Sequence, residues 1–180
     1  MQPLKTRLKV RQLPSPHHRS RRGRSVDLIV VHHITCPPGV FGTGDIEKLF
    51  LGTLDCRRHP AYRDVGGKEL SAHFLIDRRG RITQFVDTGR CAYHAGKSRW
   101  EGRSGCNDFS IGIELEGDMN NIFTSRQYCS LARLCRDLMK AHPGITPKRI
   151  VGHSDIAPGR KTDPGPRFDW KRFRKILKRV

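Results

Sequence analysis

The sequence predicts a single α/β domain built on a mixed β-sheet, and three observations support this fold class. Short apolar, β-branched runs recur along the first two thirds of the chain. One strongly amphipathic helical segment follows them, and another short apolar run comes after it. Strands combined with helices in this order are typical of layered α/β domains. The length of 180 residues and a hydrophobic content of 36% suffice for one core of this kind.

The first predicted strand is the apolar run 27–32, which reads Asp-Leu-Ile-Val-Val-His and is ended by Pro37-Pro38-Gly39. Asp45 is expected to cap a short helix that extends through Phe50. Residues 52–69 contain Gly, Pro, Asp and Arg without periodicity, so we expect a long loop there. Ordered loops of this length often carry function.

A hairpin and a third strand are predicted next. Residues 70–76 and 81–86 are expected to pair across a turn at 77–80, and residues 91–96 form a further extended stretch. Residues 97–108 are polar and are expected to form a loop. In 109–116, apolar residues alternate with Ser110, Gly112, Glu114 and Glu116, which indicates a strand with these four residues on one face.

The best helix prediction covers 124–142, where apolar residues recur at i, i+3, i+4 and i+7. Thr124 or Ser125 provides the N-cap, and Pro143-Gly144 ends the helix. A short strand at 149–151 precedes a Gly/Pro-rich loop at 152–166. A basic amphipathic helix over 169–179 closes the chain.

The net charge of +18 is concentrated at the two ends of the chain. Residues 1–24 hold eight Lys/Arg and no acid, and residues 165–180 hold seven Lys/Arg and one acid. We therefore predict a basic N-terminal extension over 1–24 and one domain over 25–180 that includes the basic C-terminal helix. Such ends stay solvated or contact nucleic acid without specificity. No base-reading module is recognisable, so no specific nucleic-acid partner is expected.

Other protein classes are disfavoured by the apolar segments and the cysteines. The longest strongly apolar stretch, 28–31, is far shorter than the roughly 20 residues of a membrane-spanning helix. No apolar segment follows the N-terminal charges, so no export signal is expected. The six cysteines contain no CxxC pair, so a thiolate zinc site is not expected. Without an export signal, and in a chain long enough to fold without disulfides, reduced thiols are expected.

Three residues are candidate metal ligands. His32 ends a buried strand, His153 follows a short strand, and Asp163 lies ten residues farther along. Two imidazoles and a carboxylate with one open position are typical of a catalytic zinc site. The spacing alone leaves this open, because a single histidine is more often structural than a ligand.

Several stretches resemble, in order, the motifs of the type-2 N-acetylmuramoyl-L-alanine amidases. The resemblance extends over about residues 13–177 and is carried by the stretches 30–34, 71–76, 92–96, 106–117 and 152–165. It implies a central mixed sheet flanked by helices, with a zinc site at the sheet edge in a surface cleft. His32, His153 and Asp163 match the family's metal ligands, so one Zn²⁺ per chain is expected.

The resemblance also implies roles for other residues and an activity. Glu114 matches the general base and Lys161 the cation that stabilises the transition state. Candidate substrate contacts are His33, Tyr93, His94 and Arg103. The implied reaction is hydrolysis of the amide bond between N-acetylmuramoyl, in the 1,6-anhydro form, and L-alanine in muropeptides. The expected context is a cytoplasmic monomer in cell-wall recycling, with no partner beyond its small-molecule substrate.

Alternatives remain at this point. The chain could cleave intact peptidoglycan, bind muropeptides without catalysis, or be a basic nucleic-acid-associated protein. Glu116 shares the predicted face of Glu114 and is a rival base. His73 is expected to pack or to orient a neighbour, and Cys36 lacks the base partner that a nucleophile needs.

Overall fold

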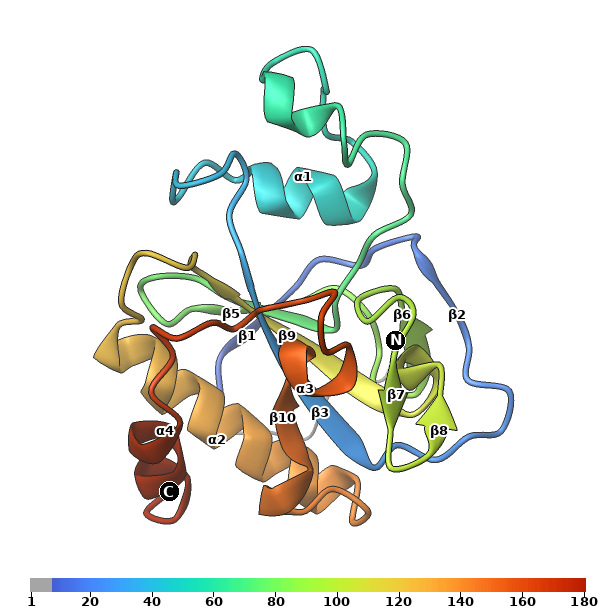
Figure 1. Ribbon diagram of the computed structural model, residues 1–180, viewed down its shortest axis with the longest axis vertical. Coiled ribbons are helices and arrows are strands. Elements are labelled where there is room, and N and C mark those ends of the chain that lie inside the picture. Colours follow the sequence, from blue (N-terminus) through green and yellow to red (C-terminus); the bar gives the residue numbers. More distant parts are fainter. Residues whose placement is uncertain (1–7) are drawn as a thin grey trace.

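The computed structural model describes residues 8–180, which form a six-stranded mixed sheet with helices on both sides (Figure 1). The strand order is β1-β5-β4-β9-β3-β10. β4 and β5 are antiparallel, and all other neighbouring pairs in this sheet are parallel. The predicted fold class is confirmed.

The strands and helices are short except for β3, β9 and α2. The strands are β1 (Val10–Gln12), β2 (His18–Ser20), β3 (Leu28–Ile34), β4 (Phe74–Ile76), β5 (Ile82–Gln84), β6 (Arg90–Ala92), β7 (Arg99–Trp100), β8 (Arg103–Ser104), β9 (Ser110–Glu116) and β10 (Ile150–Gly152). The α-helices are α1 (Asp45–Leu51), α2 (Ser125–Ala141), α3 (His153–Ile156) and α4 (Trp170–Leu177). Short 3₁₀ turns lie at Pro60–Tyr62, Cys106–Asp108 and Pro147–Arg149.

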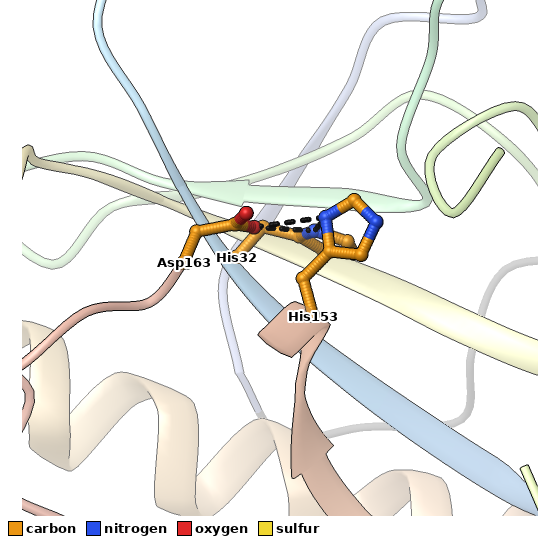
Figure 2. Close-up of side chains that lie close together, drawn as sticks. All are labelled: His32, His153 and Asp163. Carbon is orange, nitrogen blue, oxygen red and sulfur yellow. Dashed lines mark hydrogen bonds and ion pairs between the residues drawn. The ribbon is translucent and has the colours of Figure 1, made fainter. Parts of the chain in front are cut away.

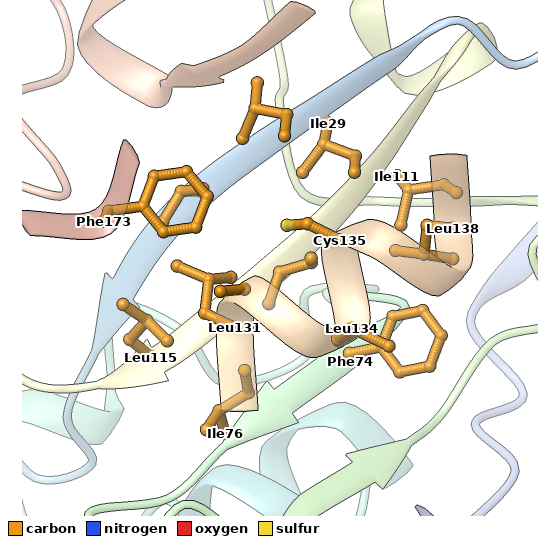
Figure 3. Packing of buried hydrophobic residues seen from close by; sticks show 14 of the residues in the cluster. Ile29, Phe74, Ile76, Ile111, Leu115, Leu131, Leu134, Cys135, Leu138 and Phe173 are labelled. Carbon is orange, nitrogen blue, oxygen red and sulfur yellow. The ribbon is translucent and has the colours of Figure 1, made fainter. Parts of the chain in front are cut away.

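The main core lies between one face of the sheet and the helices α2 and α4 (Figure 3). Ile29 of β3 and Ile111 of β9 meet Leu131 and Leu138 of α2, and all four are fully buried. Each such side chain contributes about 1.5–3 kcal/mol by leaving water. The predicted Thr124 cap is confirmed, because its hydroxyl accepts from the N–H of Gln127 in a capping box.

The opposite face of the sheet is covered by α1 and the long loop after it. Ile46, Leu49 and Phe50 of α1 form a second apolar cluster with Leu75 of β4 and Phe85. On this face the polar residues of β9 also lie, because side chains alternate along a strand. The functional site is built on this side.

The register of the parallel strands brings distant residues together. His32 of β3 lies directly opposite Glu114 of β9. Val31 of β3 lies opposite Gly152 of β10, so His153 begins α3 one step beyond that pair. The carboxyl ends of three parallel strands therefore converge at one edge of the sheet, where α/β folds present their sites.

The basic N-terminal segment is part of the domain wherever the structure describes it, which differs from the expected extension over 1–24. β1 pairs with β5 at the edge of the main sheet, and β2 pairs with β6. Arg21 is buried, and its guanidinium donates to the carbonyls of Thr88, Asn107, Asp108 and Ser110. The high positive charge of this segment predicted exposure rather than burial. A guanidinium can nevertheless be buried when all its donors are hydrogen-bonded. The rest of the predicted extension, residues 1–7, lies outside the described residues.

Local differences have physical causes. Asp45 is the first residue of α1 rather than its cap, and Gly44 occupies the cap position. The buried Asp45 carboxylate accepts from Tyr62, Lys48 and Arg58. Residues 70–73 are not in a strand, and the expected loop 97–108 holds the small β7–β8 hairpin. The expected loop 152–166 starts at the last residue of β10 and contains α3.

Two sequence-based expectations agree with the structure. All six cysteines are free. Within residues 8–180, no helix combines the length and the apolar character needed to cross a membrane.

Candidate metal centre and active site

His32, His153 and Asp163 converge at one point, as Figure 2 shows. The Nδ1 atoms of the two histidines are 3.0 Å apart, and each lies 2.9–3.0 Å from Asp163 Oδ2. The side chains of all three residues are buried. The structure therefore brings together the three residues expected to bind metal.

Each of these residues is positioned by local structure. His32 projects from the carboxyl end of β3, and His153 from the first turn of α3, whose start is fixed by the hydrogen bond from the N–H of Gly152 to Asp155. Asp163 is held beside them because its carbonyl accepts from the N–H of Ser154. A Cβ at Gly152 would lie 2.8 Å from Pro164 Cδ, so only glycine lets this loop pass so closely.

The donor atoms of this cluster suit a bound cation. His153 Nε2 lies 3.1 Å from the carbonyl oxygen of Ala95, which only accepts, so Nε2 carries the proton and Nδ1 presents a lone pair. Burial lowers the pKa of His32 to about 4, partly offset by Asp163. Two imidazoles and a carboxylate form a donor set suited to zinc.

Glu114 stands beside this cluster without a partner among the described residues. Its side chain is buried, and its Oε2 has neither solvent access nor a hydrogen bond. Burial raises the pKa of Glu114 well above its usual range; Asp163 adds to the shift and Lys161 opposes it. A buried carboxylate without a structural partner is a candidate proton-transfer group.

Glu116 is engaged elsewhere, although it shares the same face of β9. Its two carboxylate oxygens accept from the backbone N–H groups of Gly42 and Arg78. Glu114 is therefore the carboxylate of β9 that faces the metal centre. His73 also has a structural place, because its Nδ1 accepts from the N–H of Gly112 at 3.0 Å.

A cleft of about 470 Å³ opens over the centre. Lys161 is exposed at its wall and makes no side-chain hydrogen bond within residues 8–180. His33, Tyr93 and His94 also line the cleft, and burial lowers the pKa of His33. Its remaining wall includes Leu49 and Phe50 of α1, so the helix next to the long loop borders the site.

Arg103 is the one predicted substrate contact that does not line this cleft. Its guanidinium pairs with Asp27 at 2.8 Å and stacks over the ring of Phe109, 4.0 Å from the centroid. A larger cleft of about 770 Å³ lies beside β1 and β5, but no histidine is among its described lining residues. The candidate metal ligands in its lining, rather than its volume, therefore identify the cleft that is the candidate site.

Sequence reasoning missed several residues that support the centre. Asn107 and Ser110 bind the segment at residues 94–95, and Arg160 donates to the carbonyl of Ala95. The only available signal was that Asn107 and Ser110 lie within the motif 106–117. The apolar residues of α1 gave no signal, because nothing in their pattern distinguishes a cleft wall from a core.

Known proteins resemble this chain over most of its length. The N-acetylmuramoyl-L-alanine amidase family profile matches residues 22–166. The 1,6-anhydro-N-acetylmuramyl-L-alanine amidase AmpD of Haemophilus influenzae is 48% identical over 169 residues, which are 93% of this chain and 92% of that protein. Its Escherichia coli counterpart is 49% identical over 168 residues, which are 93% and 91% of the two chains.

Solved structures agree with these sequence matches. The crystal structure of a selenomethionine AmpD derivative superposes with a TM-score of 0.93 at 44% identity, covering 98% of this chain and 99% of that one. The amidase AmiD from E. coli, in complex with anhydro-N-acetylmuramic acid-L-Ala-D-γ-Glu-L-Lys, gives a TM-score of 0.62 at 29% identity. That match covers 88% of this chain and 58% of AmiD. On its fold, its convergent His, His and Asp side chains and these matches, the chain belongs to the N-acetylmuramoyl-L-alanine amidase family.

Proposed function

We propose that this protein is a zinc-dependent amidase of cell-wall recycling. It hydrolyses the amide bond between N-acetylmuramoyl, in its 1,6-anhydro form, and L-alanine in muropeptides. The observation that carries the proposal is the convergence of His32, His153 and Asp163 beside the unpartnered Glu114 in an open cleft. AmpD relatives near 48% identity over nine tenths of the chain support the substrate class.

Zn²⁺ is the proposed cofactor, one per chain. His32 Nδ1, His153 Nδ1 and Asp163 Oδ2 would hold it, which leaves a fourth position for water or substrate. When bound, zinc supplies Lewis-acid polarisation of a carbonyl and lowers the pKa of water to about 7.

Glu114 is the proposed general base. Its carboxylate faces the centre from β9 and has no structural hydrogen bond to give up when it accepts a proton from water. The same group then delivers that proton to the leaving amine, which an amide needs because an amine anion is a poor leaving group.

Lys161 is the proposed stabiliser of the tetrahedral oxyanion. Its ammonium has no hydrogen-bond partner among residues 8–180 and lies at the wall of the cleft, and a well-placed donor of this kind contributes about 3–4 kcal/mol. His33 and Tyr93 line the same wall and are the proposed substrate contacts. The stem peptide of a muropeptide is acidic, so the positive charge of Lys161 also suits it.

The proposed setting is a cytoplasmic monomer that acts on a small-molecule muropeptide. Only Val40 and Ile122 are large apolar side chains exposed within residues 8–180, so the described surface offers no apolar patch for stable self-association.

Incubation with an anhydro-muramoyl tripeptide, followed by mass spectrometry, tests the proposal. Free tripeptide should be released, its release should stop when a chelator removes zinc, and it should return when zinc is added. Intact peptidoglycan assayed in parallel tests the main alternative, an amidase of the polymer. Zinc binding without release of tripeptide from either substrate would reject the enzyme and favour a recognition module.

A further inference from the structure

We propose that His94 and Asn107 are positioning residues that orient both histidine ligands of the metal centre, an inference that rests on the proposed function. The sequence places His94 among the candidate substrate contacts. In the structure, both of its ring nitrogens are already committed to protein atoms, at 3.0 Å from His32 Nε2 and 3.3 Å from Ser110 Oγ.

A chain of hydrogen bonds sets the tautomer of His32. The Ser110 hydroxyl has one proton, which it donates to the carbonyl of Cys106 at 2.6 Å, so its oxygen accepts from His94 Nε2–H. His94 Nδ1 then carries a lone pair and accepts from His32 Nε2–H. His32 Nδ1 is therefore left with its lone pair facing His153 and Asp163, as metal binding requires.

The neighbouring residue sets the tautomer of the second ligand. The carbonyl of Ala95 accepts from His153 Nε2 at 3.1 Å and from Arg160 Nη2 at 2.7 Å. Two consecutive residues, 94 and 95, thus orient one ligand each. His94 does so through its side chain, and Ala95 through its backbone.

Asn107 anchors this pair of residues. Its side-chain Oδ1 accepts from the N–H of His94 at 3.1 Å and from the N–H of Ala95 at 2.7 Å. A shift of the segment would therefore move both hydrogen bonds to the ligands at once. One amide side chain holds the supports of both histidines.

The face of β9 is shaped to receive the His94 ring. A Cβ built at Gly112 would overlap that ring, because it would lie only 2.6 Å from Nδ1. Only a glycine at position 112 therefore leaves room for the imidazole. Ser110, Gly112 and Glu114 follow one another on the same face of this strand. The strand that presents Glu114 thus also holds the ring behind His32.

Zinc affinity tests the proposal, measured by competition between the metal-free protein and a fluorescent zinc chelator. His94→Phe keeps a ring on Gly112 but removes the acceptor for His32, and Asn107→Leu removes the anchor. Loss of such supports weakens metal binding by about 10–100-fold. We expect that weakening in both variants. Asn107→Asp, which retains an acceptor oxygen, should bind zinc more tightly than Asn107→Leu and close to wild type.

Three further measurements separate positioning from other roles. His142→Phe is the matched control, because that histidine is hydrogen-bonded to Thr88 and does not line the cleft. Thermal unfolding of the metal-free variants shows whether they fold, and Ser110→Ala replaces any that does not. In the zinc-saturated enzyme, a substrate contact would raise KM and leave zinc affinity unchanged, which would overturn the proposal.

Asp163→Ala distinguishes failure of this proposal from failure of the proposed function. If Asp163→Ala abolishes zinc binding while His94→Phe and Asn107→Leu bind as tightly as wild type, the positioning roles are rejected and the metal centre stands. If Asp163→Ala also leaves zinc affinity unchanged, the metal centre is rejected and the positioning roles with it.

Discussion

Glu114→Gln should separate catalysis from stability, because no hydrogen bond within residues 8–180 holds this carboxylate to the fold. General-base catalysis contributes about 10²–10⁴-fold, so kcat should fall by that factor, which is about 3–5 kcal/mol of activation free energy. The free energy of unfolding should stay the same or rise. The substitution is nearly isosteric, and it removes the cost of burying an unpaired carboxylate.

Glu116→Gln is the matched control two residues farther along the same strand. Its carboxylate accepts from two backbone N–H groups, those of Gly42 and Arg78, and an amide offers only one oxygen to replace it. In Glu116→Gln, one of these hydrogen bonds is lost and the amide NH2 group faces a backbone N–H instead. Such a loss costs about 1–3 kcal/mol. Glu116→Gln should therefore lower the free energy of unfolding and leave kcat close to wild type.

Two assays read out this pair of variants. Release of tripeptide from the anhydro-muramoyl substrate gives kcat for the zinc-saturated enzyme, and urea denaturation of the metal-free protein gives the free energy of unfolding. The reasoning would be refuted if Glu114→Gln kept kcat within about threefold of wild type. It would equally fail if Glu116→Gln lost as much activity as Glu114→Gln.

Three further predictions concern other parts of the molecule. Lys161→Met should lower kcat by about 10²–10³-fold with no change in urea denaturation, and a loss of stability instead would indicate a structural lysine. Arg21→Met should lower the free energy of unfolding by about 3–5 kcal/mol in the same denaturation assay, because buried carbonyls lose their donor; a loss under about 1 kcal/mol would contradict this. The hydrogen bond from Lys48, together with that from Tyr62, holds the pKa of Asp45 below its usual range. Stability from a depressed carboxylate pKa is present above about pH 4 and lost as the pH falls, so the wild type should lose more unfolding free energy than Asp45→Asn between about pH 6 and pH 2.

The larger elements could be predicted from the sequence because their patterns are local. The apolar run at 28–31 reflects a strand that is buried on both faces, whereas the alternation at 109–116 and the helical spacing from Thr124 onward each reflect one apolar face. The N-terminal segment could not be placed in this way. Its strands β1 and β2 pair with β5 and β6, which are distant in the sequence. Its composition, in contrast, is that of a solvated tail.

By itself, the sequence determined the ligand types, the family resemblance and the face of β9 that carries Glu114. Only the tertiary structure decided which polar residues are free to act. Glu114 and Glu116 are equivalent in the pattern, but backbone N–H groups from other segments occupy Glu116 alone. In the sequence, Arg103 is as plausible an anion ligand as His33. In the structure, its guanidinium is already paired with Asp27. Hydrogen bonds between residues far apart in the chain make these distinctions, and a linear pattern does not contain them.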